Sequence, residues 1–174
     1  MAIHEASHAV IRLCLGLGTL TKITVDAPNG GYLTWRTDEL HELTEGFFTA
    51  VLAAIWAGRA GEEVIMKSFA ASGGGDQAVA TKLAYDMETA MGFGQTRPLL
   101  YRSAPDWRSH LINDPELSEH VNARLEAAYN TAREMVAKQR EAIMHLAGAL
   151  FVHDTLEGPE LESHLQAVRE LLVE

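Results

Sequence analysis

The sequence predicts a mainly α domain with one small β-hairpin after the first helix and a long C-terminal helix. Three observations support this fold class. Apolar residues recur at helical spacing through most of the chain, and period-two alternation is confined to residues 20–36. Apolar positions between residues 121 and 150 recur every three or four residues, as on one face of a long helix. A length of 174 residues fits a single domain.

The first half of the chain begins with a predicted helix over residues 2–16. The hairpin follows at residues 20–36, with its turn at Pro28-Asn29-Gly30-Gly31. Thr37-Asp38 offers an N-cap for a long helix that reaches about Met66. Because this helix is apolar on most sides, we expect it to be the buried centre of the domain.

The second half is predicted to be helical apart from one irregular stretch. A glycine-rich loop, Ser72-Gly73-Gly74-Gly75, precedes a helix over residues 76–91. Prolines make residues 95–115 look irregular. The amphipathic pattern from 121 to 150 predicts one long helix, and Gly158-Pro159 marks the start of a final short one.

The composition excludes several classes of function. A formal net charge of −10 argues against nucleic acid as a partner, because phosphate binding needs a basic face. The single cysteine, Cys14, cannot form an internal disulfide, so nothing indicates an oxidising compartment. The most apolar run, Phe47 to Gly58, is too short to span a membrane, and we expect no membrane contact from this segment.

The first helix carries the pattern His4-Glu5-Ala6-Ser7-His8. Residues four apart lie on one helix face, so His4 and His8 can share a Zn²⁺ ion. Glu5 lies about 100° further round the helix, where it can deprotonate a zinc-activated water that attacks a carbonyl group. The pattern is short and also fits a helix with two surface histidines. Its apolar neighbours favour the zinc interpretation, because buried histidines and carboxylates need partners.

A catalytic zinc site needs a third protein ligand, and the sequence offers two candidates. One is Glu62 or Glu63, in Gly58-Arg59-Ala60-Gly61-Glu62-Glu63, although a salt bridge with Arg59 accounts for either glutamate equally well. The other is Asp76, after the glycine-rich loop, although an aspartate in this position is also a common N-cap. Spacing alone leaves the choice open.

Several motifs, in this order along the chain, resemble the FtsH-type zinc peptidases, which are the proteolytic half of membrane-linked AAA+ proteases. The resemblance covers residues 2–170. The motifs are His4-Glu5-Ala6-Ser7-His8-Ala9, Gly31-Tyr32-Leu33-Thr34, Gly58-Arg59-Ala60-Gly61-Glu62-Glu63, the glycine-rich loop before Asp76 with Ala80-Thr81 beyond it, the long C-terminal helix, and Thr155-Leu156-x-Gly158-x-Glu160.

The resemblance implies a helical zinc-peptidase domain over residues 1–174, with the zinc site and buried core in 1–115 and a C-terminal helical part in 116–174. It implies that Zn²⁺ is held by His4, His8 and Asp76, which decides between the two candidates for third ligand. Glu5 would be the general base. The glutamates of the other candidate would then lie behind the ligands or have structural roles (Glu62 and Glu63).

The resemblance also implies partners. Members of the family assemble as a hexameric ring, into which an AAA+ ATPase module threads unfolded polypeptide. No phosphate-binding G-x-x-x-x-G-K-[ST] loop occurs here, so the ATPase module is absent from this chain and is expected to precede it in a longer parent protein. We expect a cytoplasmic location, in a parent that is either soluble or membrane-anchored and faces the cytoplasm.

Residues Gly31-Tyr32-Leu33-Thr34 form a candidate edge strand for substrate, because zinc peptidases commonly hold a peptide as an added strand. A hairpin that merely covers the first helix fits these residues equally well. The remaining histidines have no second ligand at metal spacing along the sequence, so we expect surface or core roles for them. They are His41, His110, His120, His145, His153 and His164.

The chain departs from the family pattern at two positions. Ser7 stands where the family usually has glycine, and Gly75 stands where it usually has asparagine. Neither change removes a ligand, but both leave open a degenerate oligomerisation or adaptor module of the same fold. An unrelated zinc hydrolase of small molecules fits less well, because it leaves the later motifs unexplained.

Overall fold

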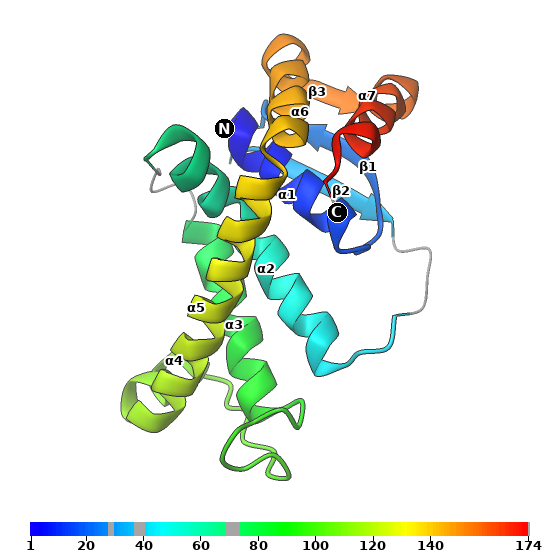
Figure 1. Cartoon of the computed structure of the whole chain (residues 1–174). Coiled ribbons are helices and arrows are strands. Elements are labelled where there is room, and N and C mark those ends of the chain that lie inside the picture. The colour runs from blue at the N-terminus through cyan, green and yellow to red at the C-terminus, as the bar shows by residue number, and fades with distance from the viewer. Residues whose placement is uncertain (28–29, 37–40, 69–73, 174) are drawn as a thin grey trace.

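The structure is a computed structural model that describes residues 1–27, 30–36, 41–68 and 74–173. These ranges hold seven α-helices, one π-helical segment and a three-stranded sheet, which confirms the mainly α fold class (Figure 1). In chain order the elements are α1 (Ala2–Cys14), β1 (Thr19–Thr24), β2 (Tyr32–Arg36), α2 (Glu45–Gly61), η1 (Glu62–Met66), α3 (Gly74–Thr89), α4 (Trp107–Asn113), α5 (Pro115–Lys138), α6 (Arg140–His153), β3 (Thr155–Glu157) and α7 (Gly158–Leu171). Across these ranges, no helix is both long and apolar enough to cross a membrane.

Helix α1 packs inside the upper part of the domain in Figure 1, between the sheet, α6 and α2. All eight residues from 4 to 11 are buried, because α2, α6 and β1 pack around the helix. Four of these buried residues are polar, namely His4, Glu5, Ser7 and His8. Burial of a polar group without a partner costs free energy, so these four side chains need hydrogen-bond or charge partners inside the protein.

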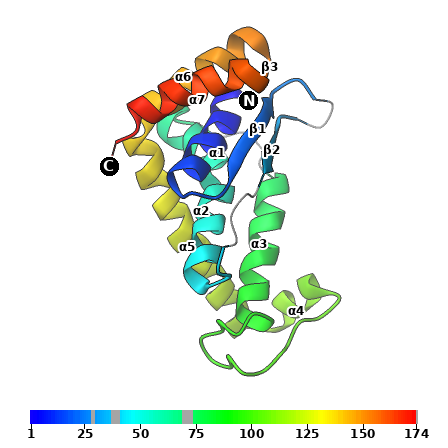
Figure 2. The same cartoon turned by 90° about the vertical axis from the view of Figure 1, so that its right-hand side faces the viewer.

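The predicted hairpin is present and belongs to a larger sheet. Strand β1 lies in the middle and pairs antiparallel with β2 on one side and β3 on the other. A bulge between Leu20 and Lys22 shifts the hairpin register. Strand β3 was not predicted, because three residues are too few for a period-two pattern. Strand β2 is an edge strand, and Figure 2 shows it close to the start of α3.

Helix α2 begins later than the sequence indicated. Thr44 is its N-cap, and the Thr44 hydroxyl accepts a hydrogen bond from the Phe47 N–H at 3.2 Å. The predicted cap at Thr37-Asp38 lies outside the described residues. The second half of α2, from Leu52 onward, is buried and packs against α1, α3 and α5, so the predicted buried centre includes this half of the helix but not its first turns. After α2 the chain continues as the wider π-helical turn η1. This turn ends at Met66, where the sequence predicted the end of the long helix.

The boundaries of the later elements also differ from the prediction. Helix α3 starts at Gly74, two residues before Asp76, whereas Ser72 and Gly73 lie outside the described residues. The stretch predicted to be irregular, residues 95–115, contains the short helix α4. Its N-cap, Asp106, accepts a hydrogen bond from the Ser109 N–H at 3.2 Å.

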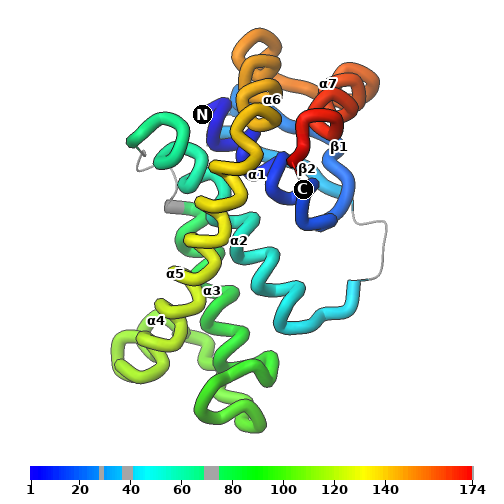
Figure 3. The backbone as a smooth tube through the Cα atoms, viewed as in Figure 1, coloured from blue at the N-terminus to red at the C-terminus, as the bar shows by residue number. Residues whose placement is uncertain are grey.

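The prediction of a single long C-terminal helix was wrong in one respect, because two helices, α5 and α6, are joined there at Gln139. Figure 3 shows the backbone passing from one helix into the other without a loop. The buried Gln139 side chain donates to the Val173 carbonyl at 2.7 Å and accepts from the Val173 N–H at 3.0 Å. These bonds tie the chain end to the break. A one-residue interruption leaves the apolar periodicity intact, so the sequence pattern does not reveal it.

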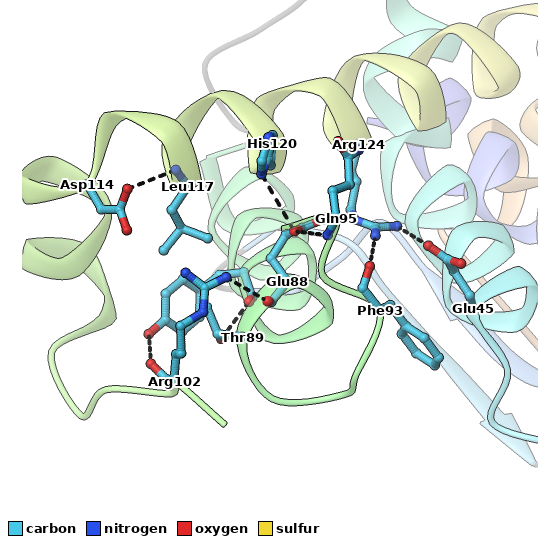
Figure 4. Close-up of polar contacts among 11 residues, drawn as sticks. Glu45, Glu88, Thr89, Phe93, Gln95, Arg102, Asp114, Leu117, His120 and Arg124 are labelled. Atoms are coloured by element: carbon cyan, nitrogen blue, oxygen red, sulfur yellow. Dashed lines mark hydrogen bonds and ion pairs between the residues drawn. The ribbon is translucent and has the colours of Figure 1, made fainter. Parts of the chain in front are cut away.

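A buried ion pair joins α3 to α5 far from α1 (Figure 4). Arg124 donates to Glu88 at 2.5 Å, to Glu45 at 2.7 Å and to the Phe93 carbonyl at 2.5 Å. The Glu88 side chain is 0% exposed, and its second oxygen accepts from the Gln95 N–H at 3.2 Å. The Arg124 guanidinium is therefore the permanent counter-charge of a carboxylate that has no access to water, and His120 Nδ1 lies 4.0 Å from its second oxygen.

Arg124→Ala is expected to destabilise the fold by about 3–5 kcal/mol, because it leaves the buried Glu88 carboxylate without its counter-charge. Urea denaturation followed by far-UV circular dichroism measures this loss. Arg169→Ala is the matched control, since its ion pair with Glu162 is largely exposed and should contribute less than about 1 kcal/mol. Equal effects of the two substitutions would contradict the assignment.

Candidate metal centre and active site

Three side-chain atoms from α1 and α3 converge on one point. The Nε2 atoms of His4 and His8 are 3.2 Å apart. The Oδ2 atom of Asp76 lies 3.1 Å from the first and 3.3 Å from the second. Both histidines are buried, and the Asp76 side chain is 32% exposed, so the cluster opens to solvent on the aspartate side. Among the described residues, these are the three side chains whose ligand atoms all stand within metal-binding distance of one another.

The remaining contacts of the imidazoles indicate which nitrogens carry protons. His8 Nδ1 lies 2.9 Å from the Ala54 carbonyl, which can only accept, so Nδ1 is the donor. A neutral His8 then presents an Nε2 lone pair to the cluster. His4 Nδ1 lies 3.3 Å from a Glu62 oxygen, at ion-pair distance but without a good hydrogen-bond angle. This carboxylate favours the same tautomer for His4. Three acceptor atoms therefore face one another, an arrangement that calls for a cation.

The size of this triangle fits zinc. A tetrahedral ion with ligands at about 2.0–2.1 Å separates its ligand atoms by about 3.3–3.4 Å. The three observed separations are 3.1, 3.2 and 3.3 Å. Two imidazole nitrogens and one carboxylate oxygen are also a ligand set that catalytic zinc sites use. The residues present therefore fit the ion in number, chemical type and spacing.

The electrostatics of the cluster also favour added positive charge. Burial lowers the pKa of His4, but the hydrogen bond with Asp76 and the charges of the nearby carboxylates outweigh burial and raise it above its usual value. Burial raises the pKa of Asp76, yet its hydrogen bonds with the two imidazoles hold that pKa well below its usual range. These hydrogen bonds require a proton on an imidazole Nε2, at the position where a metal ion would otherwise bind. Both shifts therefore mean that the site favours positive charge beside an ionised Asp76.

Two glycines of α2 allow α1 to approach closely enough to form the cluster. A Cβ atom at Gly58 would lie 2.4 Å from His8 Nε2 and 2.6 Å from His4 Nε2. A Cβ atom at Gly61 would lie 2.0 Å from the Ser7 hydroxyl oxygen. Gly58 and Gly61 thus form the surface of α2 against which α1 packs. Ser7 fits there because its hydroxyl donates back to the Ile3 carbonyl at 2.6 Å.

The two glutamates after Gly61 point in different directions. Glu62 is buried, and its carboxylate lies beside His4. The Glu63 carboxylate instead accepts a short hydrogen bond from the Tyr129 hydroxyl and lies 3.3 Å from Arg133 Nη2. Glu63 therefore joins η1 to α5 and does not contact the cluster. The widened turn of η1 carries both residues, so neighbours in sequence serve different parts of the protein.

Glu5 lies between the cluster and strand β2. The residue is only 4% exposed, and burial raises the pKa of its carboxyl group despite the opposing charges of His8 and His4. A Cβ atom at Gly31 would lie 2.5 Å from Glu5 Cγ and Oε1. Glycine at this position therefore leaves room for the carboxylate. A buried carboxyl group with a raised pKa, next to a candidate metal centre, has the properties of a general base.

A cleft of about 430 Å³ connects the cluster to β2. Three of the four residues predicted to bind substrate line it, namely Gly31, Tyr32 and Leu33, whereas Thr34 does not. The cleft also contains Arg12 and Trp35, and the Arg12 guanidinium carbon lies 4.8 Å from the centre of the Trp35 ring. Sequence reasoning missed this pair, although Arg12 lies four residues after His8 and so shares its helix face.

The positions that depart from the family pattern leave the cluster intact. Ser7 faces Gly61, away from the three converging atoms. A Cβ atom at Gly75 would have no neighbour within 4 Å among the described residues, so this glycine leaves the local packing open.

Comparison with known proteins gives a consistent result. The chain is 28% identical to the ATP-dependent zinc metalloprotease FtsH of Chloroflexus aggregans over 100% of its length, and 31% identical to FtsH 1 of Symbiobacterium thermophilum over 95%. It is 29% identical to FtsH of Mycobacterium bovis over 93%. The chain spans 29%, 28% and 23% of these three relatives, respectively. The model of peptidase family M41 matches residues 1–164, and the chain therefore belongs to this family.

Proposed function

We propose that this chain is a zinc-dependent endopeptidase domain that hydrolyses peptide bonds of unfolded polypeptides. The observation that carries the proposal is the triangle of three acceptor atoms from His4, His8 and Asp76, whose edges measure 3.1–3.3 Å. These residues would hold Zn²⁺, which, when bound, polarises the scissile carbonyl and makes water a stronger nucleophile near neutral pH. The names of the FtsH relatives support zinc and proteolysis.

The residues around the triangle have separate roles in this proposal. Glu5 accepts a proton from the attacking water and delivers it to the leaving amine, which its buried position and raised pKa favour. The Ala54 carbonyl fixes the orientation of the His8 ring, and Glu62 does the same for His4. Their task is to keep both Nε2 lone pairs directed at the ion.

The substrate is proposed to bind along β2. This strand is at an edge of the sheet. Its residues Tyr32 and Leu33, with Gly31 just before it, line the cleft that contains Glu5. An extended polypeptide can add to such an edge through main-chain hydrogen bonds, which do not depend on its sequence. Main-chain recognition suits an enzyme that degrades many unfolded proteins.

The parent protein is proposed to supply the remaining functions. Relatives that are longer than this chain are named ATP-dependent, whereas the chain has no phosphate-binding loop. An AAA+ ATPase module of the parent would therefore deliver the polypeptide. A homo-hexameric ring and a cytoplasmic location complete this proposal.

Removal of the metal tests the proposed function directly. Wild-type protein should cleave casein, which is already unfolded and needs no ATP-driven delivery. A chelator should abolish cleavage, and added Zn²⁺ should restore it. The zinc content of Asp76→Ala protein, measured by atomic emission, should be lower than that of wild type by one ion per chain. This variant should not cleave casein.

A negative result has a defined meaning. Wild-type protein that is folded by circular dichroism, yet has equal zinc content to Asp76→Ala and no cleavage, would overturn the peptidase proposal. That result would favour the alternative of an oligomerisation or adaptor module, and the native mass of the protein would then show whether it forms oligomers.

A further inference from the structure

A second pair of histidines lies close together where α6 packs against α7. His145 on α6 and His164 on α7 approach to 3.3 Å between Nε2 of the former and Nδ1 of the latter. Their ring centres are 5.4 Å apart. These residues are 19 positions apart in sequence and become neighbours only across the α6–α7 contact, so their spacing along the sequence does not reveal the pair.

This separation resembles that of the first cluster. The His4 and His8 nitrogens are 3.2 Å apart, and the His145 and His164 nitrogens are 3.3 Å apart. Two imidazole nitrogens that share a tetrahedral ion stand about 3.3–3.4 Å apart. A neutral histidine pair can also fill this distance with a single hydrogen bond, so the spacing alone does not distinguish the two arrangements.

Two further side chains lie next to this pair and add possible ligands for a metal ion. The His153 ring centre lies 6.5 Å from that of His164. His153 Nδ1 lies 3.3 Å from a Glu160 oxygen, and Glu160 precedes His164 by one turn of α7. A carboxylate at one imidazole nitrogen leaves the other nitrogen as a lone-pair donor, which is the arrangement that supports metal-binding histidines.

We propose that His145, His164 and His153 form a second site, for a divalent transition-metal ion such as Zn²⁺ or Ni²⁺. Imidazole nitrogens suit ions of this class. The His145 and His164 nitrogens already have the required spacing, and the His153 side chain, which is 44% exposed, completes the set by rotating about its side-chain bonds. This rotation moves the His153 ring from its present position beside Glu160, and water fills the remaining position.

The location of this site indicates a structural effect. His145 and His153 lie on α6, and His164 lies on α7, with β3 between the two helices. An ion here would join α6 to α7 and would close the C-terminal part around β3. Because α6 packs against α1, the ion would also support the helix that carries the first cluster, without contacting the cleft.

The test separates this site from the proposed catalytic one by removing the latter. In chelator-treated His4→Ala/His8→Ala protein, calorimetric titration with Zn²⁺ is expected to show one remaining site, and saturation is expected to raise the melting temperature. Adding His145→Gln or His164→Gln should each weaken this binding by at least about tenfold. His41→Gln is the control, because its ring stacks on Phe47 at the start of α2.

The outcomes are distinct. No zinc binding by the His4→Ala/His8→Ala protein would overturn the second site and would identify a hydrogen-bonded histidine pair. Binding that survives His145→Gln and His164→Gln would mean an adventitious ion only, and would also overturn it. Casein cleavage by His145→Gln protein should equal that of wild type. The zinc titration does not depend on cleavage, so failure of the peptidase proposal would leave its result unaffected.

Discussion

Glu5→Gln protein is expected to lose casein cleavage by about 10²–10⁴-fold while it keeps the zinc content of wild type. Glutamine has nearly the same shape as glutamate, so it fits the space beside Gly31, where the carboxylate is in close contact with the strand. It cannot accept the proton that the reaction releases. The substitution therefore removes proton transfer and spares the three proposed ligands. Initial rates with a fluorogenic casein and zinc analysis of the same samples measure both effects.

Glu63→Gln is the matched control for this experiment. Glu63 is also part of an acidic pair proposed from the sequence, but it contacts Tyr129 and Arg133 and does not line the cleft. Its substitution should leave cleavage within about twofold of wild type, at some cost in stability. If Glu5→Gln protein cleaved casein as fast as Glu63→Gln protein, Glu5 would not be the base.

Gly58→Ala is expected to lower zinc affinity by about 100-fold and cleavage with it. The added methyl group would occupy a position 2.4 Å from His8 Nε2 and 2.6 Å from His4 Nε2. Carbon atoms do not approach nitrogen this closely, so both rings must rotate away and their lone pairs no longer converge. The atoms that must move are the ends of side chains rather than backbone, so the fold should survive. Zinc competition with a chromogenic chelator gives the affinity.

Gly148→Ala provides the comparison. Gly148 also lies inside a helix, but a Cβ atom there meets nothing within 4 Å among the described residues. Alanine is a better helix former than glycine, so this substitution should raise the free energy of unfolding by up to about 1 kcal/mol without changing zinc affinity. Equal zinc affinities for the two alanine variants would mean that Gly58 does not position the histidines.

The sequence predicted the features that local pattern controls. Helical periodicity and period-two alternation located α1, β1 and β2, because these signals depend on which residues face the core. His4 and His8 could be placed on one face from their spacing alone. Their proximity to Asp76 could not be obtained from spacing, since 68 residues separate His8 from it and the fold alone brings them together. The family resemblance provided that link.

Other features required the packing to be seen. The N-cap at Thr44 competes with Thr37 and Asp38, and local sequence does not rank these three residues. The break at Gln139 depends on a contact with Val173 at the far end of the chain. Nothing in the sequence distinguishes Glu62 from Glu63 either, because their different partners follow from the widened turn of η1. The His145–His164 pair likewise depends on how α7 lies against α6.

Strand β2 has a consequence for how copies of this protein behave toward one another. Edge strands expose unpaired main-chain groups and invite association with the strands of neighbouring molecules. The other edge, β3, has three residues and is a poor template, so β2 is the edge most open to such pairing. Because β2 also borders the cleft, a neighbour bound there would occupy the proposed path of the substrate. Aggregation through this edge and digestion of a polypeptide would then compete for the same row of amide groups.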